Sequence, residues 1–323
     1  MNIKLLVTGA NGFLGRAFVV ESIRRGLPLR GVMRASPKEN LTGLHVYIAP
    51  DINGVIDWTT ALQGVEYMVH FAARVHVMKD FTVDPLAEFR RVNVAGTLNL
   101  AQQAALAGVK RFIFISSIKV NGEQTKVGQP FTEKDRFNSF DPYGISKYEA
   151  EEGLRLIAKE TGMEVVIIRP ALVYGFGVKG NFLSMMCWLH KGIPLPLGAI
   201  NNVRSLVALD NLIDFIITCL HHPMAANETF LVSDGEDLST TQLLQYTLAA
   251  MQVKPWLIPI PTSIIQTGAK LLGKSEVAKR LCCNLQVDIT KARQLLGWAP
   301  PISVREGLRR AVEGYVQSRK ELK

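Results

Sequence analysis

The sequence predicts an α/β fold built around a parallel, doubly wound sheet with a smaller, interleaved C-terminal lobe. Three features point to it: short runs rich in β-branched residues alternate with helical patterns, the runs are apolar throughout, and a glycine-rich turn follows the first run. Strands that are apolar on both faces are typical of a parallel sheet covered by helices on each side. A chain of 323 residues is long enough for such a domain and a second lobe.

The first half of the chain supplies the strands of this sheet. They are expected at residues 3–7, 29–32, 46–48, 67–71, 112–115 and 165–168. Between them, residues 85–108 and 143–162 have helical periodicity, and each segment ends at a glycine, the residue that most readily closes a helix. Both segments are long enough to be crossover helices between parallel strands.

The pattern changes in the second half of the chain. Segments containing Gly and Pro interrupt short helices there, which predicts a first domain at 1–174 and a second lobe at 175–323. Strand-like runs at 205–209 and 229–232 are expected to return to the main sheet, so that 203–222 also belongs with the first domain.

No membrane span is expected. Residues 264–272 are apolar, but they contain Lys270 and are too short to cross a bilayer, so an amphipathic helix packed on the second lobe is predicted. The strand-like pattern begins at once, without a leader, which predicts a cytoplasmic location. The net charge of +9 is spread along the chain, so nucleic acid is not expected as a partner. No metal is predicted, because the Cys and His residues lack metal-ligand spacing.

The glycine-rich turn reads Thr8-Gly9-Ala-Asn-Gly12-Phe-Leu-Gly15 and leads into a helical pattern at 16–25. Glycines in such a turn let the backbone approach a pyrophosphate, which the N–H groups of the helix N-terminus then bind. This context predicts a Rossmann-type dinucleotide site, although the spacing is GxxGxxG. The residues expected to bind the cofactor in this turn are Gly9, Asn11, Gly12, Phe13, Leu14 and Gly15.

The end of the second strand bears on which cofactor is bound. An NAD-specific site usually has an acid there for the ribose hydroxyls, whereas this chain has Arg34. Arg34, helped by Ser36 and Lys38, can pair with a 2′-phosphate, so NADP(H) is favoured and NAD(H) remains possible. Asp51 and Ile52, after the third strand, are placed to contact the adenine. A solvated arginine and an ordinary turn aspartate are the alternative explanations.

Tyr143 and Lys147 lie four residues apart in a helical pattern, which places them on one helix face. A lysine ammonium favours the phenolate of a neighbouring tyrosine, so the pair can exchange a proton with a sugar hydroxyl or carbonyl. Ser117, at the end of the fifth strand, can donate a hydrogen bond to the same oxygen. Taken alone, a YxxxK pattern is equally compatible with a solvated helix face.

Together, the motifs resemble the extended short-chain dehydrogenase/reductase superfamily, in its nucleotide-sugar epimerase and reductase branch. The resemblance covers essentially the whole chain, including a C-terminal segment like the substrate lobe of that branch. Its motifs occur in the superfamily's order and spacing: Thr8-Gly9-x-x-Gly12-x-x-Gly15, His70-Phe-Ala-Ala73, Asn93-Val-Ala-Gly96-Thr97, Ser116-Ser117-x-x-Val-x-Gly122, Tyr143-x-x-x-Lys147 and Arg169-Pro170.

The resemblance implies a role for each matching residue. Tyr143 would be the acid/base, Lys147 would bind the nicotinamide ribose and lower the tyrosine pKa, and Ser117 would orient the sugar O4. Further cofactor contacts are implied at Phe71, Ala72, Ala73, Asn93, Ser116 and Pro170. Residues implied or considered for substrate contact are Asn181 and Arg204 at a UDP diphosphate, Lys119 at the sugar or its phosphates, and His76 and Met78 in sugar choice; solvent exposure or core packing are the ordinary alternatives.

The resemblance also narrows the reaction. Dehydratases of this superfamily carry Asp-Glu directly after the position of Ser117, whereas this chain has Ile118 and Lys119, so dehydration is excluded. Arg34 and the 116–123 segment, which resembles bacterial enzymes that form UDP-N-acetylquinovosamine, favour reduction of a UDP-4-keto-6-deoxy-N-acetylhexosamine for surface polysaccharide synthesis. The alternative is a UDP-hexose or UDP-N-acetylhexosamine 4-epimerase with tightly bound NAD, which uses the same three catalytic residues.

Two further expectations concern the class of protein and its assembly. A non-enzymatic NADP(H)-sensing Rossmann protein is the rival class, and it is disfavoured because the serine, tyrosine and lysine are all present. The resemblance implies a homodimer formed by helices near 88–106 and 143–159 of each subunit.

Overall fold

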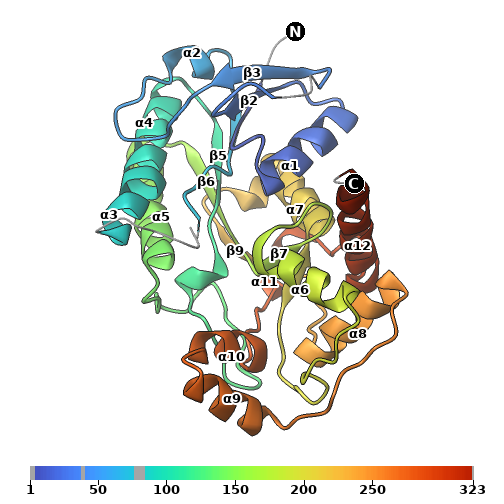
Figure 1. Ribbon diagram of the computed structural model, residues 1–323. Coiled ribbons are helices and arrows are strands. Elements are labelled where there is room, and N and C mark those ends of the chain that lie inside the picture. The colour runs from blue at the N-terminus through green and yellow to red at the C-terminus, as the bar shows by residue number, and fades with distance from the viewer. Residues whose placement is uncertain (1–3, 38–40, 76–83, 322–323) are drawn as a thin grey trace.

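A computed structural model describes residues 4–37, 41–75 and 84–321 (Figure 1). Seven parallel strands form the main sheet in the order β3-β2-β1-β4-β5-β6-β9. They are β1 (Leu5–Thr8), β2 (Leu29–Met33), β3 (Leu44–Ile48), β4 (Tyr67–His70), β5 (Arg111–Ile115), β6 (Glu164–Pro170) and β9 (Thr229–Val232). The predicted fold class and the six strands expected in the first half are confirmed.

Helices cover both faces of the sheet, and each face has its own apolar core (Figure 1). One face packs against α2 (Thr59–Leu62), α4 (Thr97–Leu106) and α5 (Pro142–Thr161). The other packs against α1 (Phe13–Arg24), α7 (Leu209–His221) and α11 (Thr290–Leu296). The strand order reverses between β1 and β4, so the carboxyl ends of these strands flank the point where ligands bind in open α/β sheets.

The helix predicted at 85–108 is present but not regular. It comprises α3 (Pro85–Phe89), a π-helical turn η1 (Arg90–Gly96) and α4. Gly96 lies so close to the loop after β3 that an added Cβ would be 2.8 Å from Cγ2 of Ile52. π-Helical turns insert extra backbone into a helix and are frequent at functional sites.

The second lobe differs from the prediction at one strand. The run at 229–232 joins the main sheet as β9, but the run at 205–209 forms β8 (Leu206–Ala208), which pairs with β7 (Leu172–Tyr174) in a separate two-stranded sheet. The expected return of β8 to the main sheet is therefore wrong. The physical reason is that Leu206 packs with Tyr174 in the core of the second lobe.

The remaining elements build that lobe and its connections. They are α6 (Gly180–His190), α8 (Thr240–Met251), α9 (Thr262–Leu271), α10 (Ser275–Cys282), α12 (Val304–Glu321) and the short 3₁₀ turns η2 (Ile118–Val120) and η3 (Pro223–Ala225). Helix α9 lies where an amphipathic helix was predicted; it packs against α10 with half-buried residues on one side, and none of its residues is fully buried. Within the described ranges, no helix is long and apolar enough to cross a bilayer.

A buried ion pair joins α5 to the sheet. The Glu151 side chain on α5 is fully buried, and the guanidinium of Arg169 on β6 donates to both of its oxygens at 2.9 and 2.5 Å. The hydroxyl of Ser116 donates to the same carboxylate at 2.5 Å. Since an unpaired buried charge is strongly destabilising, these partners fix α5 against β5 and β6.

We expect Arg169→Met to lower the free energy of unfolding by about 3–5 kcal/mol, because it removes the main partner of a buried carboxylate. Urea unfolding monitored by circular dichroism measures the change. The matched control is Glu152→Ala, which removes an exposed ion pair with Arg155 on the same helix and should cost less than about 1 kcal/mol. Equal losses in the two variants would contradict the role given to the buried pair.

Candidate active site

The glycine loop packs closely against the neighbouring strand end. Gly9 directly follows β1 with φ +66°, and a Cβ on it would lie 2.9 Å from the backbone N of Ala72, just beyond β4. A Cβ on Gly15 would lie 2.1 Å from the carbonyl oxygen of Gly9. The N–H of Gly12 donates to that same oxygen at 2.9 Å, which closes the turn. Gly9 and Gly15 are therefore required by the backbone itself, and Gly12 closes the turn.

This loop fits a dinucleotide pyrophosphate. Helix α1 begins at Phe13 with Gly12 as its N-cap, and no side chain in the described structure caps it. Its first turn carries no acidic residue, so the N–H groups of Phe13, Leu14 and Gly15 and the positive end of the helix dipole favour an anion. Asn11 is exposed beside them. These residues would hold the pyrophosphate of a bound cofactor.

A buried hydrogen-bond chain fixes the strand ends beneath the loop. The hydroxyl of Thr8 lies 2.7 Å from Nδ1 of His70, and Nε2 of His70 lies 3.0 Å from the hydroxyl of Thr97. The N–H of Ala72 donates to the Thr8 hydroxyl at 3.3 Å. Burial lowers the pKa of His70 to about 3, with a further contribution from the charge of Lys147. His70 is therefore neutral and links β1, β4 and α4.

Asn93 holds the segment after β4. Its amide oxygen accepts from the N–H of Arg74 at 2.8 Å, and its amide nitrogen donates to the carbonyl of Arg74 and to the hydroxyl of Ser146, both at 3.0 Å. The Ser146 hydroxyl in turn donates to the carbonyl of Tyr143 at 2.8 Å. Asn93 thus connects η1 to α5 and supports the half-buried cleft residues Phe71, Ala72 and Ala73.

Ser117 and Tyr143 each lie at the start of a helix, which fixes their positions. Ser117 follows β5 and caps η2, its hydroxyl accepting from the N–H of Lys119 at 3.2 Å. Tyr143 lies in the first turn of α5, which begins with Pro142 and is capped by the carboxylate of Asp141 on the N–H of Gly144. The Tyr143 ring packs edge-on against Phe89 at 6.1 Å between ring centres.

Lys147 lies one turn further along α5 and is buried. Its ammonium donates to the carbonyl of Ile115, at the end of β5, at 2.7 Å. It lies 4.2 Å from the ring centre of Phe114 and 6.0 Å from that of Tyr143. Burial lowers the pKa of Lys147 to about 7, while the Glu151 carboxylate acts in the opposite direction.

Two effects raise the pKa of Tyr143 above its usual value near 10 in the protein without ligands: burial of the phenol and the charge of the Asp141 carboxylate. Tyr143 is consequently a proton donor near neutral pH in the protein without ligands. The implied role of Lys147, to lower this pKa in the working enzyme, stays a prediction.

Lys119 does not simply point to solvent. Its ammonium donates to Asp141 at 2.9 Å and lies 6.0 Å from the centre of the Tyr143 ring. Two lysines therefore lie near the same tyrosine, Lys147 from the buried side and Lys119 beside the helix start. The motif analysis missed Asp141; an Asp-Pro pair directly before a helical pattern is the signal that would have identified it as the cap.

The residues predicted for the adenosine site lie just beyond β2 and β3. Arg34 is exposed just beyond β2, and Lys38, like His76 and Met78, lies outside the described residues. The carboxylate of Asp51 accepts from the N–H of Ile52 at 2.9 Å and pairs with the guanidinium of Arg91 at 2.5 Å. Asp51 is thus already bound to a cation of η1, while Ile52 packs against Gly96.

The remaining predicted residues lie in different settings. Ser116 turns its hydroxyl to Glu151, and Pro170 ends β6 in the interior. Asn181 is exposed in the first turn of α6. Arg204 is half-buried and donates to the carbonyl of Cys283 at 3.0 Å, which ties it to the end of α10.

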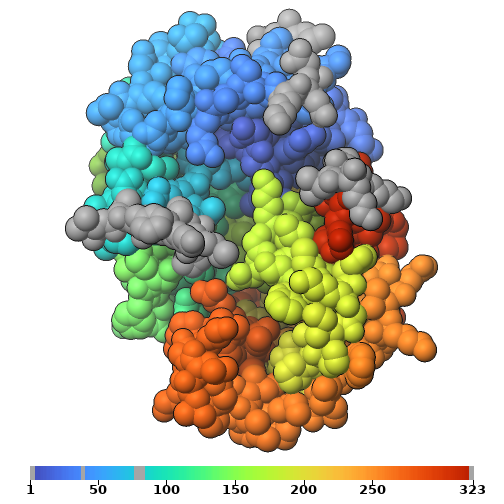
Figure 2. Space-filling view, in the orientation of Figure 1, coloured from blue at the N-terminus to red at the C-terminus, as the bar shows by residue number. Residues whose placement is uncertain are grey.

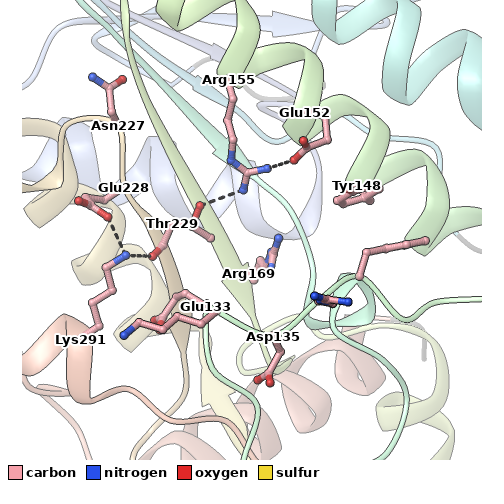
Figure 3. Close-up of a pocket in the computed structure, with 13 residues that line it drawn as sticks. Glu133, Asp135, Tyr148, Glu152, Arg155, Arg169, Asn227, Glu228, Thr229 and Lys291 are labelled. Carbon is pink, nitrogen blue, oxygen red and sulfur yellow. Dashed lines mark hydrogen bonds and ion pairs between the residues drawn. The ribbon is translucent and has the colours of Figure 1, made fainter.

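A separate polar pocket of about 410 Å³ lies beside β6 and β9 (Figure 3). Figure 3 shows its side chains largely paired: Arg155 contacts Glu152 and Thr229, and Lys291 contacts Glu228 at 2.6 Å. Arg169 lines it from the interior, but Ser117, Tyr143 and Lys147 do not line it. The pocket is therefore distinct from the candidate active site.

Comparisons with known proteins agree with this geometry. Residues 5–233 match the model of the NAD dependent epimerase/dehydratase family. The chain is 46% identical over 316 residues to a UDP-glucose 4-epimerase of Vibrio cholerae, covering 97% of this chain and 96% of that relative. It is 28% identical to an N-acetyl-alpha-D-glucosaminyl-diphospho-ditrans,octacis-undecaprenol 4-epimerase of Escherichia coli O157:H7, covering 99% of this chain and 98% of that relative.

A solved structure extends the likeness to three dimensions. The UDP-glucose 4-epimerase of Thermotoga maritima, solved with UDP-glucose, superposes with a TM-score of 0.77 at 26% identity, covering 99% of this chain and 100% of that chain. The sheet, the glycine loop and the Ser-Tyr-Lys set define a dinucleotide-dependent enzyme. The chain belongs to the NAD-dependent epimerase/dehydratase family. The predicted resemblance to the wider superfamily is confirmed.

We expect Tyr143→Phe to lower turnover by about 10²–10⁴-fold, the usual size of a general acid–base contribution, while cofactor binding is kept. Steady-state kinetics and fluorescence titration of reduced nicotinamide cofactor test the two parts. Tyr148→Phe is the matched control, because Tyr148 is on the same helix but stacks on Phe137. A Tyr143→Phe enzyme with most of its activity would show that the mechanism is wrong.

The neutral His70 predicts a pH dependence of stability. Below about pH 6.5 the unfolded chain binds a proton that the folded chain, with a His70 pKa of about 3, does not bind. Stability should therefore fall with decreasing pH in this window, by up to about 1.4 kcal/mol per pH unit. Urea unfolding at several pH values should show this loss of unfolding free energy in wild type and in the variant His45→Gln, which changes an exposed histidine. The loss should be absent in His70→Gln. A slope unchanged by His70→Gln would refute it.

Proposed function

We propose that this enzyme catalyses 4-epimerisation of a UDP-sugar and keeps an NAD-type cofactor bound during turnover. The observation that carries the proposal is the near full-length relationship to a UDP-glucose 4-epimerase. The intact Ser117, Tyr143 and Lys147 at the carboxyl end of β5 support it. The 4-epimerase was the alternative in the sequence analysis, and we now prefer it to reduction of a 4-keto sugar.

The side chains would act on the oxygen at C4 of the sugar. Ser117 donates a hydrogen bond to this oxygen, and Tyr143 takes the hydroxyl proton as the alcohol is oxidised. The keto sugar then rotates to present its other face. As the ketone is reduced on that face, Tyr143 returns the proton to the oxygen, so no proton is gained or lost overall. Bound NAD would supply the hydride acceptor and donor. Because burial raises the pKa of Tyr143, the phenolate needs nearby positive charge, for which Lys119 and Lys147 are placed.

Reduction of a 4-keto sugar is the second candidate. The observation that favours it is Arg34, which is exposed at the end of β2 and suits the 2′-phosphate of NADP(H). A proton-donating Tyr143 also suits the reductive direction. The catalytic residues are common to both reactions, so cofactor exchange separates the candidates.

The proposal includes the substrate contacts, the assembly and the location. Asn181 and Arg204 are the proposed ligands of the UDP diphosphate. A homodimer through α3–α4 and α5 is supported by Leu106 and Leu156, apolar side chains on these helices that are 88% and 55% exposed. The cytoplasm remains the proposed location.

The deciding experiment follows both the sugar and the cofactor. For an epimerase, denatured protein should release NAD, and UDP-glucose or UDP-N-acetylglucosamine should be interconverted with its C4 epimer without added cofactor. Stoichiometric loss of NADPH or NADH absorbance with a UDP-4-keto-6-deoxy-N-acetylhexosamine would instead establish the reductase and overturn the epimerase. Arg34→Ala should weaken NADPH binding about tenfold, the value of one charge-assisted hydrogen bond, and leave NADH binding unchanged.

A further inference from the structure

Helices α9 and α10 form a hairpin at the outer end of the second lobe, which we call the 262–282 hairpin. Figure 1 shows the two helices side by side at the lower edge of the molecule, and Figure 2 shows this segment on the surface. Gly273, with φ +66°, ends the turn between them, and the N–H of Lys274 donates to the carbonyl of Ala269 at 2.7 Å. Residues 270–274 therefore form a tight, ordered tip.

The apolar side chains of this hairpin are unusually exposed. At the tip, Leu271 is 84% exposed and Leu272 is 73% exposed. Ile264 is 60% exposed and lies seven residues before Leu271, on the same helix face. Trp256, in the segment leading to α9, is 62% exposed. An apolar surface of this kind on an ordered element indicates an interaction site.

Positive charge surrounds these apolar side chains. Residues 254–283 contain one acidic residue, Glu276, which pairs with Lys279 at 2.8 Å. Lys270 and Lys274 are both exposed and directly flank the tip. The basic residues of this segment are Lys254, Lys270, Lys274, Lys279 and Arg280.

We propose that the 262–282 hairpin docks on the surface of an anionic lipid bilayer, with Leu271 and Leu272 at the acyl boundary and Lys270 and Lys274 at the headgroups. An apolar tip flanked by lysines matches both layers of such an interface. A second copy of the chain fits less well, because it would bring two sets of lysines together. Nucleic acid would use the lysines but leave the leucines exposed. The docking does not depend on the proposed reaction.

The hairpin is joined firmly to the second lobe. The amide nitrogen of Asn202 donates to the carbonyls of Leu281 and Cys283 at 3.2 and 3.0 Å, and Arg204 donates to Cys283 at 3.0 Å. Arg204 is also a proposed ligand of the sugar diphosphate. Docking would therefore hold the second lobe, and with it the mouth of the proposed substrate site, in a fixed relation to the lipid surface.

Vesicle co-sedimentation of the full-length protein tests the proposal. Wild type should bind vesicles of phosphatidylcholine with phosphatidylglycerol at least about tenfold more tightly than vesicles of phosphatidylcholine alone, and added salt should weaken the binding. The double variant Leu271→Ser/Leu272→Ser should lose at least about tenfold in affinity, as should Lys270→Glu/Lys274→Glu. These side chains are exposed, so folding should be unchanged in circular dichroism.

Matched controls remove similar groups elsewhere. Val20→Ser/Val55→Ser removes two side chains that are 48% and 89% exposed, and Lys134→Glu/Lys179→Glu makes the same charge change on exposed positions. Both controls should bind as wild type does. Equal binding to neutral vesicles, or loss of binding in the controls as large as in the tip variants, overturns the proposal. So does a tip variant that changes only the oligomeric mass in light scattering, because the occupant is then a second copy.

Discussion

The buried carboxylate of Glu151 is the interaction on which the active-site geometry depends. It lies under α5, the helix that carries Tyr143 and Lys147, and it is held by Arg169 from β6 and by Ser116 at the end of β5. Ser117, the third residue of the proposed catalytic set, is the next residue in the chain. One charged group therefore fixes α5 and β5, which carry the proposed catalytic residues, to each other. The same charge acts on the buried Lys147 and opposes the effect of desolvation on its pKa.

The parts of the fold that could be predicted from the sequence are those with local, periodic patterns. Apolar runs located the strands, and Gly9, Gly12 and Gly15 located the nucleotide loop, because each feature depends on neighbouring residues alone. The partner of a strand is not local: β8 was assigned to the wrong sheet because its pairing with β7 depends on the core around Tyr174. Similarly, no pattern shows that a continuous helical segment contains a π-helical turn.

The active site shows the same division. Ser117, Tyr143 and Lys147 were predicted as the catalytic residues from their spacing, but spacing gives no sign that burial and the Asp141 carboxylate raise the Tyr143 pKa. The hydrogen-bond chain from Thr8 through His70 to Thr97 also escaped prediction, although all three residues lie in motifs that were recognised. Their chemistry is visible only when β1, β4 and α4 are brought together.

The interleaved path of the chain limits how such an enzyme can be recombined. The second lobe is not a detachable C-terminal module, because α7 and β9 return to the main sheet between its segments. A chimaera that took everything after residue 174 from another enzyme would also replace the edge strand β9 and two helices, α7 and α11, that cover the main sheet. Exchange of substrate preference, in evolution or in the laboratory, is thus expected to proceed through several small replacements on either side of β9.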